Sequence, residues 1–213
     1  MTTVLAGLDL AALLCSRVCH DLISPTGAIV NGLEVLEDSK DDETRDFALA
    51  LIKKSAGQAA ARLQFCRLAF GAAGSAGAEI NLADAESVAR GFVEDDKVKL
   101  AWSLPRALAP KNRVKLLLNL LVVATQAIPR GGTLSVEGDA AQGFRITARG
   151  MNARIPQPAE RFLTGAAMDG VDAHAIQPYY AALLAQDCGL RVAIANPVGV
   201  AHCKQVFVFE KPT

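Results

Sequence analysis

This sequence has no excess of charge of either sign, no long apolar run and no closely spaced pair of cysteines of the C-x-x-C type. Its 22 Lys and Arg residues balance 22 Asp and Glu residues, so no overall field favours nucleic acid or an anionic membrane. No stretch approaches the roughly 18 consecutive apolar residues of a transmembrane helix. The start, MTTVLAGLDLAALLC, lacks the pattern of a signal peptide. We therefore expect a cytoplasmic protein that binds neither nucleic acid nor membranes.

The cysteines also lack the spacing of a metal site. The chain has five, Cys15, Cys19, Cys66, Cys188 and Cys203, and no C-x-x-C pair among them. An odd number without ligand spacing argues against both a zinc site and a disulfide framework. We expect reduced thiols and no bound metal.

Apolar material is plentiful and follows a helical period in the first third of the chain. Hydrophobic residues make up 51% of the 213, enough for a packed core in one or two domains. Residues 8–37 and 43–70 are predicted helices, and the DSKDD segment between them predicts a tight turn. A lone antiparallel hairpin would leave apolar stripes uncovered, so we expect two copies to form a dimeric four-helix bundle.

A polar stripe of the first predicted helix carries a histidine. The spacing places His20 on a face with Ser16 and Ser24, away from the leucines, and Pro25 predicts a kink just beyond it. An exposed neutral imidazole, whose ordinary pKa is about 6.5, has a lone pair free for nucleophilic attack. From spacing alone, a surface histidine without any role is equally consistent.

The rest of the chain mixes helices and strands. The small-residue segment 71–77, GAAGSAG, predicts a flexible linker, and we place the domains at 1–75 and 78–213. The pattern predicts helices at 81–92, 112–128 and 179–188, strands at 98–104, 133–138, 144–148, 191–196 and 204–209, and mostly loop at 149–177. Helices packed on one antiparallel or mixed sheet make an α+β fold.

The hairpin, linker and layered domain together resemble the core of a bacterial sensor histidine kinase over nearly the whole chain. HDLISP at residues 20–25 resembles the H-box of the dimerisation and phosphotransfer hairpin. NLLVVA at 119–124, followed by PRGGTL at 129–134, resembles the N-box helix and the strand after it. The resemblance implies that His20 is the phosphorylated residue and that the second domain is an ATPase-like α/β sandwich.

The sequence departs from the kinase pattern at the positions that bind the nucleotide and its magnesium ion in kinases. Val123 stands where kinases place an asparagine that ligates magnesium, and its methyl groups offer no oxygen to that hard cation. The adenine-binding D-x-G-x-G box aligns with GMNARI at 150–155, where Gly150 replaces the aspartate and Asn152 the first glycine. The last glycine-rich box is replaced by DAHAIQP at 172–178. We therefore expect a degenerate domain without nucleotide-binding residues, and no ATP-dependent kinase activity.

A phosphotransfer hairpin followed by a degenerate kinase-like domain is similar to the ChpT family of bacterial histidine phosphotransferases, as is RLQFCRLAFG at 62–71. The resemblance implies a phosphorelay. His20 would accept a phosphoryl group from the receiver aspartate of a hybrid kinase resembling CckA and pass it to response regulators resembling CtrA and CpdR. Mg²⁺ would come with the receiver domain, so this chain would need no cofactor.

Other residues of the H-box helix have predicted supporting roles. Asp21 would orient the imidazole and stabilise the positive charge that it develops. The predicted docking surface for a receiver comprises Arg17, Ile23, Ser24 and Gly27, and Ser24 also stands where related kinases orient a water for phosphoaspartate hydrolysis. Two alternatives stay open: an active histidine kinase with a divergent nucleotide pocket, and a non-enzymatic dimeric scaffold that docks receivers.

Overall fold

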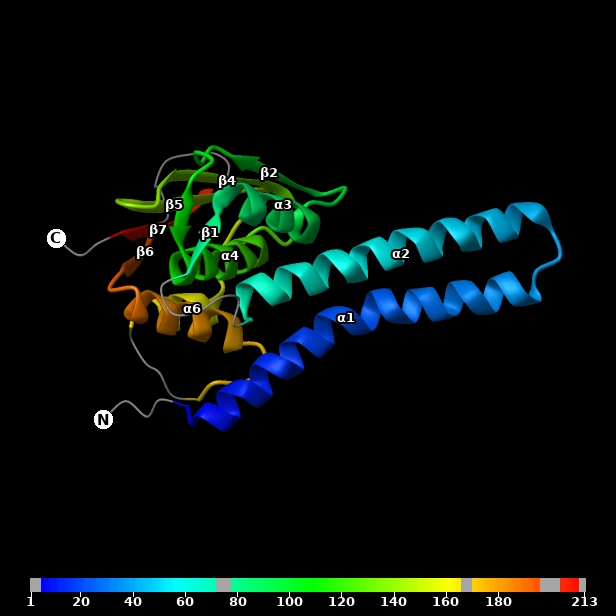
Figure 1. Cartoon of the computed structure of the whole chain (residues 1–213), viewed down its shortest axis with the longest axis horizontal. Helices are drawn as coiled ribbons and strands as arrows, with labels where there is room; N and C mark the ends of the chain where they lie inside the picture. Colours follow the sequence, from blue (N-terminus) through cyan, green and yellow to red (C-terminus); the bar gives the residue numbers. More distant parts are fainter. Residues whose placement is uncertain (1–4, 72–77, 166–169, 196–203, 211–213) are drawn as a thin grey trace.

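Two long antiparallel helices project from the body of the molecule (Figure 1). The computed structural model of the chain describes residues 5–71, 78–165, 170–195 and 204–210. The hairpin consists of α1 (Gly7–Asp38) and α2 (Asp42–Ala69), and both helices lie within one residue of their predicted bounds. Asp41 is the N-cap of α2, and its side chain accepts the Thr44 N–H at 2.8 Å. The predicted hairpin is confirmed; most of the predicted linker, residues 72–77, lies outside the described residues.

The two helices of the hairpin approach each other closely near the turn. Gly32 of α1 is buried, and a Cβ atom at this position would lie 2.7 Å from Cγ1 of Ile52 in α2. Closer to the turn, Arg45 donates a hydrogen bond to the Leu36 carbonyl at 2.8 Å. Helix α1 runs through Pro25 without interruption and bends in its middle portion (Figure 1).

The second part of the chain is built on a five-stranded mixed sheet. Its strand order is β2-β4-β5-β7-β6, with β2 and β4 parallel and the other neighbours antiparallel. A separate antiparallel pair, β1 with β3, lies outside this sheet. The elements are β1 (Glu79–Asn81), α3 (Leu82–Val93), β2 (Val98–Trp102), β3 (Leu108–Pro110), α4 (Lys111–Gln126), β4 (Gly132–Asp139), β5 (Gly143–Arg149), α5 (Gln157–Leu163), α6 (Ile176–Asp187), β6 (Arg191–Ala195) and β7 (Lys204–Glu210).

The arrangement confirms the predicted α+β fold. Helices α3, α4 and α6 lie on one face of the sheet, between it and the hairpin (Figure 1). Helix α4 is central: every residue from Val114 to Ala124 is buried, as expected of a helix that is apolar nearly all round. The sequence pattern missed three short elements, β1, β3 and α5, and extended the predicted strand 98–104 beyond the end of β2 at Trp102.

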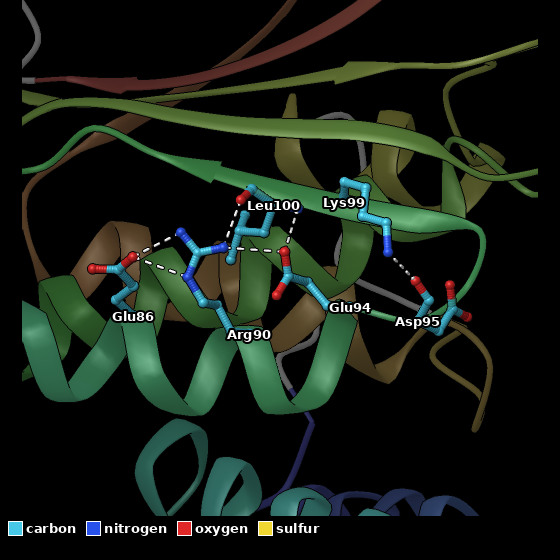
Figure 2. Close-up of polar contacts among 6 residues, drawn as sticks. All are labelled: Glu86, Arg90, Glu94, Asp95, Lys99 and Leu100. Carbon is cyan, nitrogen blue, oxygen red and sulfur yellow. Dashed lines mark hydrogen bonds and ion pairs between the residues drawn. The ribbon is translucent and has the colours of Figure 1, made fainter.

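One arginine connects α3 to the edge strand β2 (Figure 2). The Arg90 guanidinium donates to Glu86 at 2.8 and 3.0 Å, to Glu94 at 3.0 Å and to the Leu100 carbonyl at 2.7 Å. Glu94 in turn accepts the Leu100 N–H at 3.0 Å. Because these bonds satisfy both backbone groups of a single strand residue, they fix the C-terminal half of α3 against β2.

Two loops of the second part of the chain contain residues with positive φ. Gly131 and Gly132 have φ values of 88° and 145°, which side-chain-bearing residues rarely adopt. Asn152 has a φ of 56°, in the left-handed region that asparagine tolerates. These residues therefore allow tight turns at the start of β4 and after β5.

Candidate functional site

His20 lies in the middle of α1 with its imidazole in solvent. Its side chain is 80% exposed, and the next turn of the helix is open as well, with Ile23 70% exposed. Pro25, five residues after His20 in the same helix, is buried. The structure therefore places His20 on the solvent face that its spacing predicts.

The neighbouring carboxylate is buried and held in place. The Asp21 side chain is 10% exposed, and its Oδ2 atom accepts a hydrogen bond from Nε of Arg17 at 3.1 Å. Its main-chain carbonyl accepts a hydrogen bond from Arg62 of α2. Two arginines thus contact Asp21: Arg17 of α1 bonds its carboxylate, and Arg62 of α2 bonds its backbone. Asp21 is therefore not an ordinary exposed acidic residue.

The histidine and the aspartate face each other without a close hydrogen bond. Nδ1 of His20 lies 3.5 Å from Oδ1 of Asp21, beyond the usual 2.7–3.2 Å of a nitrogen–oxygen hydrogen bond. The carboxylate is near enough to attract a positive charge on the ring. Since Nδ1 is turned to Asp21, Nε2 on the opposite edge of the ring is the atom presented to solvent.

A thiol lies beneath the site. Cys66 of α2 is buried, and burial, reinforced by the negative charge of Asp21, raises the pKa of its thiol to about 11. A cysteine in that state is protonated at neutral pH and is a poor nucleophile. Cys15 and Cys19 are exposed on the histidine helix.

The four residues predicted to dock a receiver divide into two groups. Ile23, Ser24 and Gly27 are exposed and lie within two turns of His20. Arg17 does not lie free on that surface: its side chain is 18% exposed and pairs with Asp21. Its place in the site is to hold the carboxylate.

Sequence reasoning missed the contribution of Arg62. This residue lies on α2, 41 positions after Asp21, and reaches its backbone across the hairpin. The signal that could have found it is the hairpin register, because residues equally far from the turn near residue 40 face each other. That rule places a residue around position 60 opposite Asp21.

The two positions of α4 that were compared with the N-box present no ligand atoms to solvent. Asn119 and Val123 of α4 are both 0% exposed. A cleft of about 700 Å³ lies between α5 and the segment before α6, with Arg161 and His174 among its lining residues, and no residue of α4 lines it.

Within the described ranges there is no cluster of three His, Cys, Asp or Glu side chains suited to a metal ion. The same ranges contain no helix with the length and apolar character needed to cross a membrane.

Comparison with known proteins shows the family of the chain and agrees with its fold. Residues 82–197 match the family model of the histidine phosphotransferase C-terminal domain. Protein phosphotransferase ChpT of Brucella abortus (strain 2308) is 51% identical over 198 residues, which cover 91% of this chain and 93% of that protein. The solved structure of a bacterial phosphotransferase superposes with a TM-score of 0.85 at 46% identity, covering 99% of this chain and 100% of that one. The chain belongs to the histidine phosphotransferase family.

Proposed function

We propose that His20 is the phosphoryl carrier of this phosphotransferase. In a phosphorelay, the imidazole would take the phosphoryl group from the aspartate of one receiver domain and give it to the aspartate of another, without ATP. The observation that carries the proposal is the 80% exposed ring of His20 beside the fixed carboxylate of Asp21.

The first transfer is an in-line displacement at phosphorus. Nε2 of His20 attacks the phosphoryl group, the N–P bond forms, and the P–O bond to the receiver aspartate breaks, which releases a free carboxylate. The proton stays on Nδ1, so the ring becomes positively charged. The carboxylate of Asp21, 3.5 Å from Nδ1, offsets that charge. The second transfer is the same reaction in reverse, on another receiver.

Positioning and charge neutralisation supply most of the catalysis in phosphoryl transfer. The Mg²⁺ that neutralises the phosphoryl oxygens belongs, in this proposal, to the partner receiver, and no cofactor is held by this chain. The burial of Asn119 and Val123 supports this proposal, because these two positions of α4 then offer neither an amide nor an oxygen to a nucleotide phosphate.

The hairpin also suggests a homodimer. Its side chains include an unusual number of exposed large apolar groups for one helix pair, and a monomer seldom leaves so much apolar surface in water. These residues are Leu8, Ile23, Val30, Leu33, Val35, Phe47, Leu49 and Leu63. We propose that a second copy covers most of them in a four-helix bundle, and that Ile23 with Ser24 and Gly27 stays open for the receiver.

Partners and location follow from the resemblance. We propose a CckA-like hybrid kinase as the donor and response regulators resembling CtrA and CpdR as acceptors, in the cytoplasm of a bacterial cell and in control of its cell cycle. The same exposed apolar and small residues after His20 would receive a helix of the receiver.

A labelling experiment separates this proposal from its rivals. Purified protein is incubated with radiolabelled ATP alone, and in parallel with a receiver domain that carries labelled phosphoaspartate. His20→Ala and, as a control at the neighbouring exposed position, Cys19→Ser are treated alike. We expect acid-labile label from the receiver on the wild type and on Cys19→Ser, and none on His20→Ala.

Two other outcomes would contradict the proposal. Label from ATP alone would indicate an active kinase with a divergent nucleotide pocket. A receiver that binds but leaves no label on any variant would indicate a docking scaffold.

A further inference from the structure

Asn119 is a polar residue in the most apolar element of the protein. It lies within the run Val114–Ala124 of α4, all of it buried, and is itself 0% exposed. Burying an amide is unfavourable unless its hydrogen-bonding groups are satisfied inside the protein. The partners of Asn119 therefore show what the residue does in the fold.

Those partners come from three helices. Nδ2 of Asn119 donates to the carbonyl of Lys115 at 2.8 Å, within α4, and to the carbonyl of Ala69 at 3.2 Å. Ala69 is the last residue of α2, where helix carbonyls lack intrahelical partners. Oδ1 of Asn119 accepts a hydrogen bond from the side chain of Gln177 in α6, which is 1% exposed. One buried side chain thus links the end of the hairpin to two helices of the second domain.

Helix α6 holds the other end of the hairpin as well. The hydroxyl of Tyr179, a fully buried residue, accepts the backbone N–H of Leu5 at 2.9 Å, just before α1 begins. The ring of Tyr180 lies 5.8 Å from that of Phe70, at the end of α2. Figure 1 shows α6 between α4 and the first turns of α1. Both ends of the hairpin are therefore attached to one helix.

The attached domain reaches the level of His20. Phe92 of α3 stacks on Phe65 of α2 with ring centroids 4.0 Å apart, one turn from Arg62, which bonds the residue after His20. A receiver domain of about 100 residues has a radius of gyration near 13 Å. A partner of that size, bound at His20, covers several turns of the hairpin and also contacts the second domain. The angle between the second domain and the hairpin therefore determines how the partner fits.

We infer that Asn119 and Gln177 are positioning residues for phosphotransfer: their buried hydrogen bonds hold the second domain at one angle to the hairpin, and so present a receiver with His20 and the second domain as one rigid surface. This inference rests on the proposed function of His20. The residues set the geometry of the receiver complex and do not touch the phosphoryl group.

The test uses two variants of different severity. Asn119→Leu keeps a side chain of similar size but leaves the Ala69 carbonyl and Gln177 unpaired. Gln177→Met removes only one donor and keeps the bond between Asn119 and Ala69, so we expect it to destabilise the fold less than Asn119→Leu does. Val136→Ala, in the fully buried part of β4, is the matched control, because it weakens the core of the second domain away from the hairpin.

The angle of the domain is measured with spin labels on unnatural residues that replace Lys40, in the hairpin turn, and Lys99, in β2, with labelled chains diluted into unlabelled ones. We expect one narrow distance distribution for the wild type and for Val136→Ala, and broader distributions for the two variants. The Michaelis constant for a phosphorylated receiver should rise about five- to tenfold, the scale of one lost buried hydrogen bond, with little change in kcat. Phosphorylation of His20 by phosphoramidate, which needs no docking, should be unchanged.

A narrow distribution in both variants would overturn the inference, and so would a broadened distribution with an unchanged Michaelis constant. Failure of phosphoramidate to label His20 in the wild type would instead count against the proposed function. These results are distinguishable because the first two compare variants and the last concerns the wild type alone.

Discussion

At the scale of single residues, the site depends on an aspartate that arginines hold in place. Asp21 accepts a hydrogen bond from Arg17 through one carboxylate oxygen and faces Nδ1 of His20 with the other. The hydrogen bond from Arg17 holds the carboxylate in position before a receiver domain binds. The imidazole is 80% exposed and accessible to a receiver, and in the proposed phosphorylated state its positive charge would face a carboxylate that is already in position.

Replacing this carboxylate should therefore slow the chemistry. We expect Asp21→Asn to lower the rate of His20 phosphorylation on the order of tenfold, which corresponds to about 1.4 kcal/mol of transition-state stabilisation. Asp9→Asn, at an exposed position near the start of the same helix, should have no effect. Single-turnover labelling by phosphoramidate measures both. Equal rates for Asp21→Asn and the wild type would mean that the carboxylate plays no part in the reaction.

At the scale of elements, the long helices could be predicted and the short ones could not. The 3.6-residue period runs through 32 residues of α1 and 28 of α2, which is ample signal. Strands β1 and β3 have three residues each and form only because they pair with each other. The exposure of His20 followed from the same period. The Arg62 contact, over 41 positions, needs the register of the hairpin as well, and the Gln177 contact, over 58 positions, depends on tertiary packing that no local pattern reveals.

Two glycines of the hairpin should respond in opposite ways to the same substitution. Gly57→Ala adds a methyl group with no described atom within 4 Å, so it should raise the free energy of unfolding by about 0.5–1 kcal/mol through helix propensity. Gly32→Ala places its Cβ atom 2.7 Å from Ile52, and the cost of overpacking, about 1–3 kcal/mol, should exceed that gain. Urea unfolding of both variants decides the matter. A stabilised Gly32→Ala would show that the helices are not in tight contact.

At the scale of the whole molecule, the second domain is attached to both ends of the hairpin that carries His20. Tyr179 of α6 accepts a hydrogen bond from Leu5 before α1, and Asn119 of α4 donates one to Ala69 at the end of α2. The exposed apolar side chains of the hairpin then remain as the surface on which we propose that two copies meet.

This surface makes a prediction about assembly. Leu33→Glu adds a charge where the side chain is 46% exposed on α1, and the cost of burying that charge should convert the proposed dimer into a monomer at micromolar concentration. Leu108→Glu, at a 59% exposed position of β3 outside the hairpin, should leave the assembly unchanged. Sedimentation velocity gives the mass of each. A wild-type protein that sediments as a monomer would contradict the proposed dimeric four-helix bundle.

The passing-on of the phosphoryl group tests the central claim most directly. Protein labelled on His20 is separated from its donor, transferred to ATP-free buffer with Mg²⁺, and mixed with a second, unphosphorylated receiver. The control is a variant of that second receiver in which the phosphate-accepting aspartate is replaced by alanine. We expect the label to leave His20 and to appear on the aspartate of the intact receiver, while the control receiver stays unlabelled and the phosphohistidine persists. A phosphohistidine that no receiver can discharge would contradict the relay.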